Sequence, residues 1–219
     1  MDNTEILSET KRILKDNYNK VMVPFFLMVI ISAITQNQDI ISNIYDNYGV
    51  VTGTVYSLIS VVIASVIGVG LASFSLSIVE GRTDTNKLKD GLNVVPKAVV
   101  IYLLYVVAIV VGLLLLIIPG LIVGIMFSQV FFILSKDPDV DVIDAFKQSA
   151  AMMNGYKWQY LWLSLRYGLY FVLSIFTLFI WTLWLLPQMY TSYALFHAKV
   201  SGSYDCLLYT SPSPRDRSI

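Results

Sequence analysis

The feature that most constrains the fold is a long apolar stretch without charge. Residues 98–135 contain no Asp, Glu, Lys or Arg. One membrane-spanning helix needs about 20 apolar residues, so this stretch is long enough for two. The dipeptide Pro119-Gly120 stands near its middle. Because irregular backbone cannot be exposed to lipid, we expect the dipeptide to form a turn at a membrane face, between two spans.

The composition extends this interpretation to the whole chain. Hydrophobic residues make up 56% of it and charged residues 14%, whereas about 25% of residues are charged in soluble domains. We therefore expect an integral membrane protein whose main partner is the lipid bilayer, with another membrane protein or a lipid headgroup as further candidates. The formal net charge is zero, so nothing points to a nucleic acid as partner. One cysteine and one histidine provide no disulfide framework and no conventional metal cluster, and no cofactor is expected.

Polar and charged segments divide the chain into predicted spans. We predict an all-α, polytopic transmembrane bundle that forms a single membrane domain over residues 21–200. A polar loop is expected at 36–48, and a last turn near 177–182, although the sequence leaves open whether the last apolar stretch is one span or two. The glycines at 49, 53, 68 and 70 suggest close helix packing in the second span. The spans are about six: 21–35, 50–79, 98–118, 120–135, 157–179 and 180–200.

Short amphipathic helices are expected between the spans. Residues 1–20 place Ile6 and Leu14, with other apolar residues, on one helical face. This helix would lie in the membrane interface or pack on cytosolic loops of the protein itself. Asp137 followed by Pro138 predicts an N-cap and a first helical residue, and the helix that they begin would end before Gly155. Its apolar stripe also predicts a position on the membrane surface.

The basic residues predict the topology. Before residue 206, every Lys and Arg lies in or beside the segments 1–20, 80–97 and 136–166, or at position 199. The alternate loops, 36–48, 119–120 and 177–182, contain none. Since Lys and Arg accumulate on the cytoplasmic side, we expect a multi-pass protein of the cell membrane with both termini in the cytoplasm.

The last residues are interpreted separately. The run from Cys206 to Asp216 resembles a translated sequencing adapter. We therefore expect residues 206–219 not to be native and the true C-terminus to be absent from this sequence.

Several motifs resemble a known family. They occur in order at residues 115–120 (ending in Pro119-Gly120), 131–138 (ending in Asp137-Pro138), 144–149, 152–157 (including Gly155) and 183–187 (ending in Pro187). Together they resemble the bacterial integral membrane family catalogued as domain of unknown function 975, over about residues 10–200 and most specifically in the second half. The family is distantly similar to the membrane domain attached to some glycerophosphodiester phosphodiesterases, which implies an association with envelope lipids. It implies no catalytic residue.

Few residues suggest chemistry. Arg166 lies within the fifth predicted span, where an unpaired charge is costly, so it is expected either to contact an anion such as a lipid phosphate or to extend to the interface. Gln129 and Gln188 are polar groups within spans that would bond a neighbouring helix or line a pathway. Gly120 and Gly124 are spaced for close approach of a neighbouring helix. His197 is interpreted as an interface residue.

Three functions are compatible with these residues. A non-enzymatic scaffold or sensor of the cell envelope is favoured, because the sequence contains no catalytic motif. The alternative is a transporter or lipid-handling protein, which a polar cavity at the level of Gln129 and Gln188 would favour. An intramembrane enzyme would require at least two converging ionisable side chains, and only Arg166 is a candidate.

Overall fold

The computed structural model describes residues 3–15, 18–115, 117–177 and 181–203, and every regular element among them is a helix. The all-α prediction is therefore confirmed. In chain order the helices are α1 (Asn3–Lys15), α2 (Tyr18–Thr35), α3 (Gln38–Val79), η1 (Thr85–Lys89), α4 (Asp90–Asn93), α5 (Val95–Leu115), α6 (Ile117–Met126), α7 (Val130–Lys136), α8 (Val142–Met152), α9 (Lys157–Ser174), η2 (Ile175–Thr177) and α10 (Thr182–Val200).

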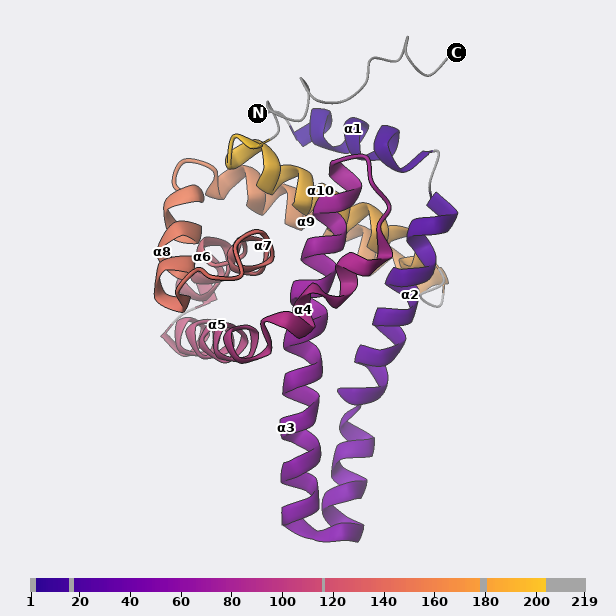
Figure 1. The fold of residues 1–219 in the computed structure, drawn as a ribbon, viewed down its shortest axis with the longest axis vertical. Helices are drawn as coiled ribbons and strands as arrows, with labels where there is room; N and C mark the ends of the chain where they lie inside the picture. Colours follow the sequence, from indigo (N-terminus) through magenta and orange to yellow (C-terminus); the bar gives the residue numbers. More distant parts are fainter. Residues whose placement is uncertain (1–2, 16–17, 116, 178–180, 204–219) are drawn as a thin grey trace.

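A hairpin of α2 and α3 projects from the rest of the molecule (Figure 1). Its tip is Gly49, which interrupts α3 with a φ of 82° that favours glycine. The predicted loop at 36–48 is therefore wrong, because most of it is helical. The Asn37 side chain caps this segment by accepting hydrogen bonds from the backbone N–H groups of Asp39 and Ile40.

The remaining helices form a head at the other end of the hairpin. Figure 1 shows α3 along the long axis, α5 nearly end-on, and α1, α9 and α10 lying across the top. The helices therefore do not run parallel to one another as in a simple bundle. Three stretches of the described chain are long and apolar enough to cross a membrane: Val21–Val79, Val95–Leu114 and Ile118–Lys136. The prediction of membrane-spanning helices is supported at this level, whereas the number of six spans is not confirmed.

The second hairpin joins α5 to α6, but Pro119-Gly120 is not its turn. Both residues lie in the first turn of α6, which begins at Ile117, and the connection falls at residue 116, outside the described residues. Proline is tolerated there because the first N–H groups of a helix have no partner within it. Gly112 of α5 approaches Gly120 closely, since a Cβ at Gly112 would stand 2.7 Å from the Gly120 Cα.

The helix predicted after Asp137 begins four residues later. Asp137 ends α7 and its side chain accepts a hydrogen bond from the backbone N–H of Asp139 at 3.1 Å, so Asp137-Pro138 stand in a turn. The N-cap of α8 is Asp141, whose side chain accepts from the backbone N–H of Ile143 at 3.1 Å. Gly155 has a φ of 85° in the turn to α9, which places it where glycine is favoured.

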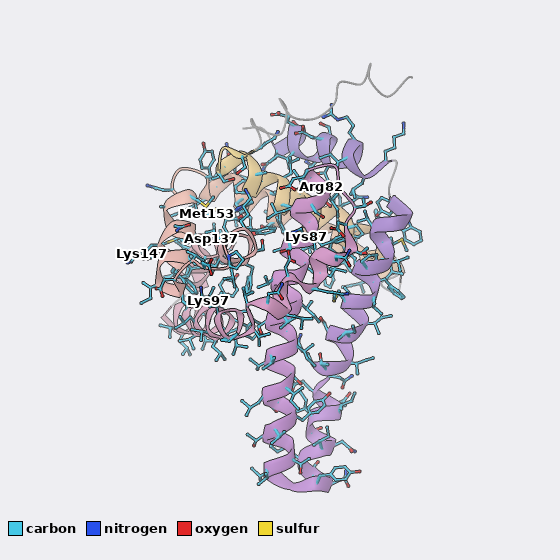
Figure 2. The ribbon with its side chains drawn as sticks, viewed as in Figure 1. Arg82, Lys87, Lys97, Asp137, Lys147 and Met153 are labelled. Carbon is cyan, nitrogen blue, oxygen red and sulfur yellow. The ribbon has the colours of Figure 1, made fainter. Side chains whose placement is uncertain are left out.

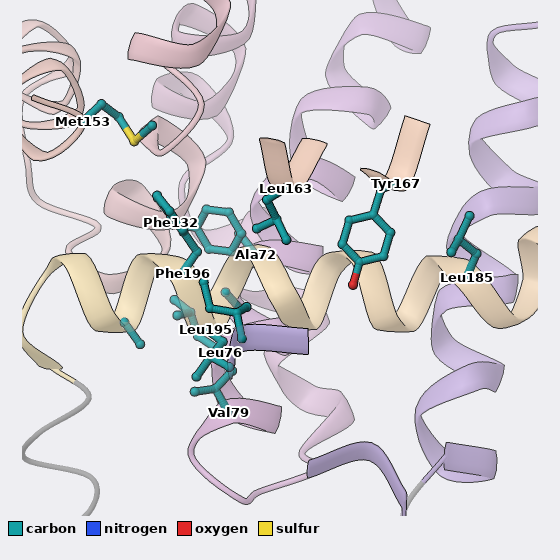
Figure 3. Packing of buried hydrophobic residues seen from close by; sticks show 13 residues of the cluster. Ala72, Leu76, Val79, Phe132, Met153, Leu163, Tyr167, Leu185, Leu195 and Phe196 are labelled. Carbon is teal, nitrogen blue, oxygen red and sulfur yellow. The ribbon is translucent and has the colours of Figure 1, made fainter. Parts of the chain in front are cut away.

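Within the segment 1–20 the structure has a helix over Asn3–Lys15, α1, which packs on the protein itself. Ile6 and Leu14 of α1 are buried to 0% and 1% exposure, and α1 lies against α10 (Figure 1). Its apolar face is therefore covered by helices of the head, not by the loops considered as the alternative. Figure 3 shows the core beneath it, where Phe132 and Leu163 gather around Phe196 of α10. The expectation for residues 206–219 lies outside the described residues.

Candidate functional site

Gln129 and His197 form a buried polar pair in the head. Gln129 is fully buried, and its Oε1 lies 3.2 Å from Nδ1 of His197 in α10. The Gln129 Nε2 donates to the Ser128 Oγ at 2.9 Å, which fixes the orientation of the amide. Because Oε1 can only accept, Nδ1 of His197 carries the proton in this pair. The pair joins the connection between α6 and α7 to α10.

His197 is not the interface residue that was predicted. Its exposure is 1%, and its ring stacks on Phe132 with 5.3 Å between the ring centroids. From the sequence, His197 is expected at the end of a helix beside Lys199, where exposure is usual. The core lies at this end of α10 because α1 and α7 cover it, which is a tertiary effect that no local pattern contains.

Ser149 of α8 extends the same polar cluster. Its hydroxyl donates to the Met126 carbonyl at 2.7 Å and accepts from the backbone N–H of Gln129 at 3.3 Å. These bonds satisfy backbone groups freed where α6 ends and α7 begins. A single buried serine thus attaches α8 to the apolar helices.

A second polar chain joins α9, α10 and α1. The Tyr167 hydroxyl lies 2.6 Å from the Ser192 Oγ, which lies 3.0 Å from the Thr10 Oγ1. Tyr167 also donates to the main-chain carbonyl of Gln188 at 3.3 Å. Figure 3 shows the Tyr167 hydroxyl directed at α10. All of these groups satisfy one another inside the core, as buried polar groups must.

An ion-pair cluster completes the docking of α1. Lys199 Nζ of α10 lies 3.0 Å from Glu5 Oε1 and 2.7 Å from Glu9 Oε2. The side chains of Lys199 and Glu9 are 10% and 13% exposed, so this pair is largely removed from water. The cluster therefore fixes the position of α1 on α10.

Arg166 lies on the outer face of α9, away from these joints. It is exposed and lines an apolar groove of about 740 Å³, together with Trp162, Leu165, Leu169 and other residues. Within the described part of the chain, no acidic side chain forms an ion pair with it. Among the described residues that line it, the groove therefore combines an apolar wall with one cation.

The structure does not gather the three predicted polar residues into one site. Gln129 meets α10 at residue 197. Gln188, nine residues earlier on α10, contacts Tyr167 of α9 only through its main-chain carbonyl. At a rise of about 1.5 Å per residue these levels differ by about 13 Å. Gln129 is enclosed by its partners, and Arg166 faces outward. Of the two predicted glycines, Gly120 packs closely on α5, whereas a Cβ at Gly124 would make only ordinary contact, at 3.9 Å, with Ile109.

The two charged connectors meet in a cleft that was not predicted from the sequence. Two adjoining cavities of about 250 and 200 Å³ share the residues Lys87, Asp90, Ser135 and Lys136, and Figure 2 shows Lys87 and Arg82 close to the end of α3. Lys87 lies 3.4 Å from Asp90. The Glu80 carboxylate, which bonds to the Arg82 guanidinium, raises the pKa of Arg82. The sequence identified both charged connectors but contained no signal that they meet.

The polar side chains of the interior mainly bind one another and thereby hold the helices together. In the residues that the structure describes, no group of three His, Cys, Asp or Glu side chains is placed to hold a metal ion. The polar side chains of the interior instead connect one helix to the next. The fold and these joints define an all-helical protein with apolar helices compatible with a membrane.

Residues 96–203 match the family described as Protein of unknown function (DUF975), and this part of the chain belongs to that family. The resemblance drawn from the motifs between Pro119 and Pro187 is thereby confirmed. No curated protein and no solved structure matches the chain. The remote similarity to the membrane domain of glycerophosphodiester phosphodiesterases stays a prediction.

Proposed function

We propose that this protein is a non-enzymatic, multi-pass membrane protein that acts as a scaffold or sensor of the bacterial cell envelope, with its base-rich head in the cytoplasm. The observation that carries the proposal is the use of the interior polar side chains. Gln129 with His197, and Tyr167 with Ser192, form joints between helices. A catalytic or transport site would leave such groups facing a substrate or a pathway.

The projecting hairpin supplies the contact surface of the scaffold. Five apolar residues on the tip-side half of α3 are 51–79% exposed: Val50, Val51, Val55, Leu58 and Ile59. An apolar surface of this kind in water would be an aggregation hazard, whereas in a membrane it can contact lipid or another membrane helix. The many serines and glycines of α3 suit helix-to-helix contact.

Photocrosslinking in cells tests the scaffold. A photoreactive amino acid at Leu58 should give a discrete adduct with a second membrane protein or a second copy of this chain. The same amino acid at Ile143, exposed on α8 of the head, serves as the comparison. A discrete protein adduct at Leu58 that is absent at Ile143 is the expected result. Lipid adducts alone at Leu58 and at Val55 would contradict a scaffold acting through this hairpin.

A lipid-handling protein is the second candidate. It is favoured by the apolar groove beside Arg166, because a cation within an apolar wall matches the two parts of a phospholipid. The groove does not include Gln129 or Gln188, the residues at which a central polar pathway was predicted.

A further inference from the structure

The cleft in which the two charged connectors meet is a candidate binding site separate from the groove beside Arg166. Its two cavities, of about 250 and 200 Å³, adjoin one another beside α3. Lys87 of η1 and Lys136 at the end of α7 line both cavities, and Arg82 lines one of them. Figure 2 shows Arg82 and Lys87 at the same end of α3. Three cations from three segments of the chain therefore border one small space.

The carboxylates of the cleft are less exposed than the cations with which they pair. The side chain of Asp90 is 30% exposed, whereas that of its partner Lys87 is 46% exposed. The Glu80 side chain is 29% exposed, whereas that of its partner Arg82 is 70% exposed. With Lys136, the described lining has three cations and two carboxylates, a net charge of +1. The open side of the cleft therefore presents positive charge.

The two lysines keep hydrogen-bond donors for a ligand, because an ammonium group has three N–H donors. Lys136 Nζ donates to the Ser203 Oγ at 2.7 Å and, within the described part of the chain, forms no ion pair with a carboxylate. Lys87 Nζ lies 3.4 Å from the Asp90 carboxylate, which is longer than a charge-assisted hydrogen bond. The Asn93 amide lines the same cleft and adds two N–H donors. Lys87, Asn93 and Lys136 are all exposed residues, so a ligand can reach them from solvent.

We propose that this cleft binds a phosphate group, either inorganic phosphate or a phosphate monoester. A phosphate monoester carries a charge of about −1.5 to −2 at pH 7 and three strong acceptor oxygens. Its oxygens accept hydrogen bonds from Lys87, Asn93 and Lys136, and Arg82 adds positive charge at the rim. A carboxylate has one charge and two oxygens, so it matches this set of donors less well. The proposal goes beyond the scaffold role, since it concerns the head and needs no contact of the α2–α3 hairpin.

Two sources can supply this phosphate group. Lys136 is the last residue of the apolar stretch Ile118–Lys136, which is long enough to cross a membrane. The cleft would therefore lie where this stretch meets water. A lipid with a phosphate-monoester headgroup and a soluble phosphate monoester can both reach such a boundary. Their shared chemistry is the doubly charged phosphate, and separate measurements distinguish them.

Titration calorimetry of the full chain in a non-ionic detergent tests the site, with inorganic phosphate as the probe. Phosphate should bind, whereas acetate at the same ionic strength should not. Lys136→Gln should weaken phosphate binding by about tenfold or more, because it removes a hydrogen bond to a charged group. Lys89→Gln is the matched control. It removes a cation of the same short helix as Lys87 that lines neither cavity, and it should leave the affinity unchanged.

Asp90→Asn is expected to change the affinity in the opposite direction. It removes the carboxylate that competes for Lys87 and keeps the shape of the side chain, so phosphate should bind several-fold more tightly. Phosphate binding that is equal in the wild type and Lys136→Gln, or reduced equally in Lys89→Gln, would overturn the proposal. Should Lys136→Gln fail to fold, Asp90→Asn decides: an affinity that is unchanged or weaker than that of the wild type overturns it.

Nanodiscs distinguish a lipid source from a soluble one. The protein is released from nanodiscs that contain phosphatidic acid and phosphatidylcholine in equal amounts, and the retained lipids are counted by native mass spectrometry. Loss of phosphatidic acid in Lys136→Gln but not in Lys89→Gln identifies a lipid headgroup as the source. Equal retention by both variants, together with phosphate binding in detergent, identifies a soluble phosphate monoester. If phosphate does not bind and retention does not depend on Lys136, the proposal is refuted for both sources.

Discussion

At the scale of single residues, the close approach of α5 and α6 in the second hairpin depends on Gly112 and Gly120. A Cβ at Gly112 would stand 2.7 Å from the Gly120 Cα, which is backbone and cannot move aside as a flexible side chain would. A Cβ at Gly124 would stand 3.9 Å from Ile109, an ordinary contact. Gly112 and Gly124 therefore differ: an added methyl group would clash with backbone at Gly112 and would fit at Gly124.

Gly112→Ala is predicted to destabilise the protein by about 1–3 kcal/mol, the usual range for overpacking. Gly124→Ala is predicted to be neutral or stabilising by up to about 1 kcal/mol, because alanine is the better helix former. Unfolding by heat or denaturant in detergent measures both. If Gly112→Ala were as stable as Gly124→Ala, α5 and α6 would not cross at Gly112.

The buried amide of Gln129 gives a second prediction. Gln129→Ala leaves Nδ1 of His197 without its partner in a site that water does not reach. The expected loss is about 1–3 kcal/mol of unfolding free energy, the cost of a buried polar group left unsatisfied. Gln148→Ala, at an exposed position of α8, should change it by less than about 0.5 kcal/mol. If Gln129→Ala lost no more unfolding free energy than Gln148→Ala, the pair with His197 would add no stability.

At the scale of elements, α1 is attached by charge as well as by apolar packing. Lys199→Met leaves the largely buried Glu9 carboxylate without this cation and keeps most of the apolar stem. We expect a loss of about 1–3 kcal/mol and faster hydrogen exchange in α1. Lys147→Met removes a cation that is 72% exposed and paired at the surface, so its effect should be within about 0.5 kcal/mol. Unchanged exchange in α1 would show that the apolar face alone holds it.

The elements that sequence reasoning predicts best are those with a local signal. Helices α1, α9 and α10 occur in segments where the pattern of apolar and charged residues predicts helices. Helices α9 and α10, predicted as the fifth and sixth spans, are not among the described stretches that are long and apolar enough to cross a membrane. The short helix η1 is capped by Asp84, whose side chain accepts a hydrogen bond from the backbone N–H of Asn86. These features depend on side-chain periodicity and capping, which a single sequence contains.

The errors arise where polarity or proline was interpreted without tertiary context. Residues 38–48 are polar, yet they form a helix because Asn37 caps them and Tyr45 packs over Gly53. Pro119 was interpreted as a turn residue, although the start of a helix accommodates proline equally well. The meeting of Gln129 and His197 depends on how the connection between α6 and α7 lies against α10, and no pattern along the chain determines that.

At the scale of the whole molecule, charge is separated along the long axis. The hairpin tip at residues 36–50 contains Asp39 and Asp46 but no Lys or Arg. The basic residues that Figure 2 labels, among them Arg82 and Lys147, lie in the head. For a membrane protein with this distribution, the positive-inside rule predicts that the basic end lies in the cytoplasm. The six spans predicted from the sequence would also place the head on the cytoplasmic side. The orientation of the α2–α3 hairpin can be tested directly.

Cysteine labelling in intact cells tests this orientation. In a Cys206→Ser background, Asn43→Cys or Asp46→Cys at the hairpin tip should react with a membrane-impermeant maleimide added from outside. Asp90→Cys and Asp144→Cys in the head should react only after permeabilisation. Asp144 is exposed and Asp90 is partly exposed, so access to water does not limit the reaction of either cysteine. Labelling of the head in intact cells, with the tip protected, would reverse the orientation, and labelling of both without permeabilisation would show that the hairpin does not cross the membrane.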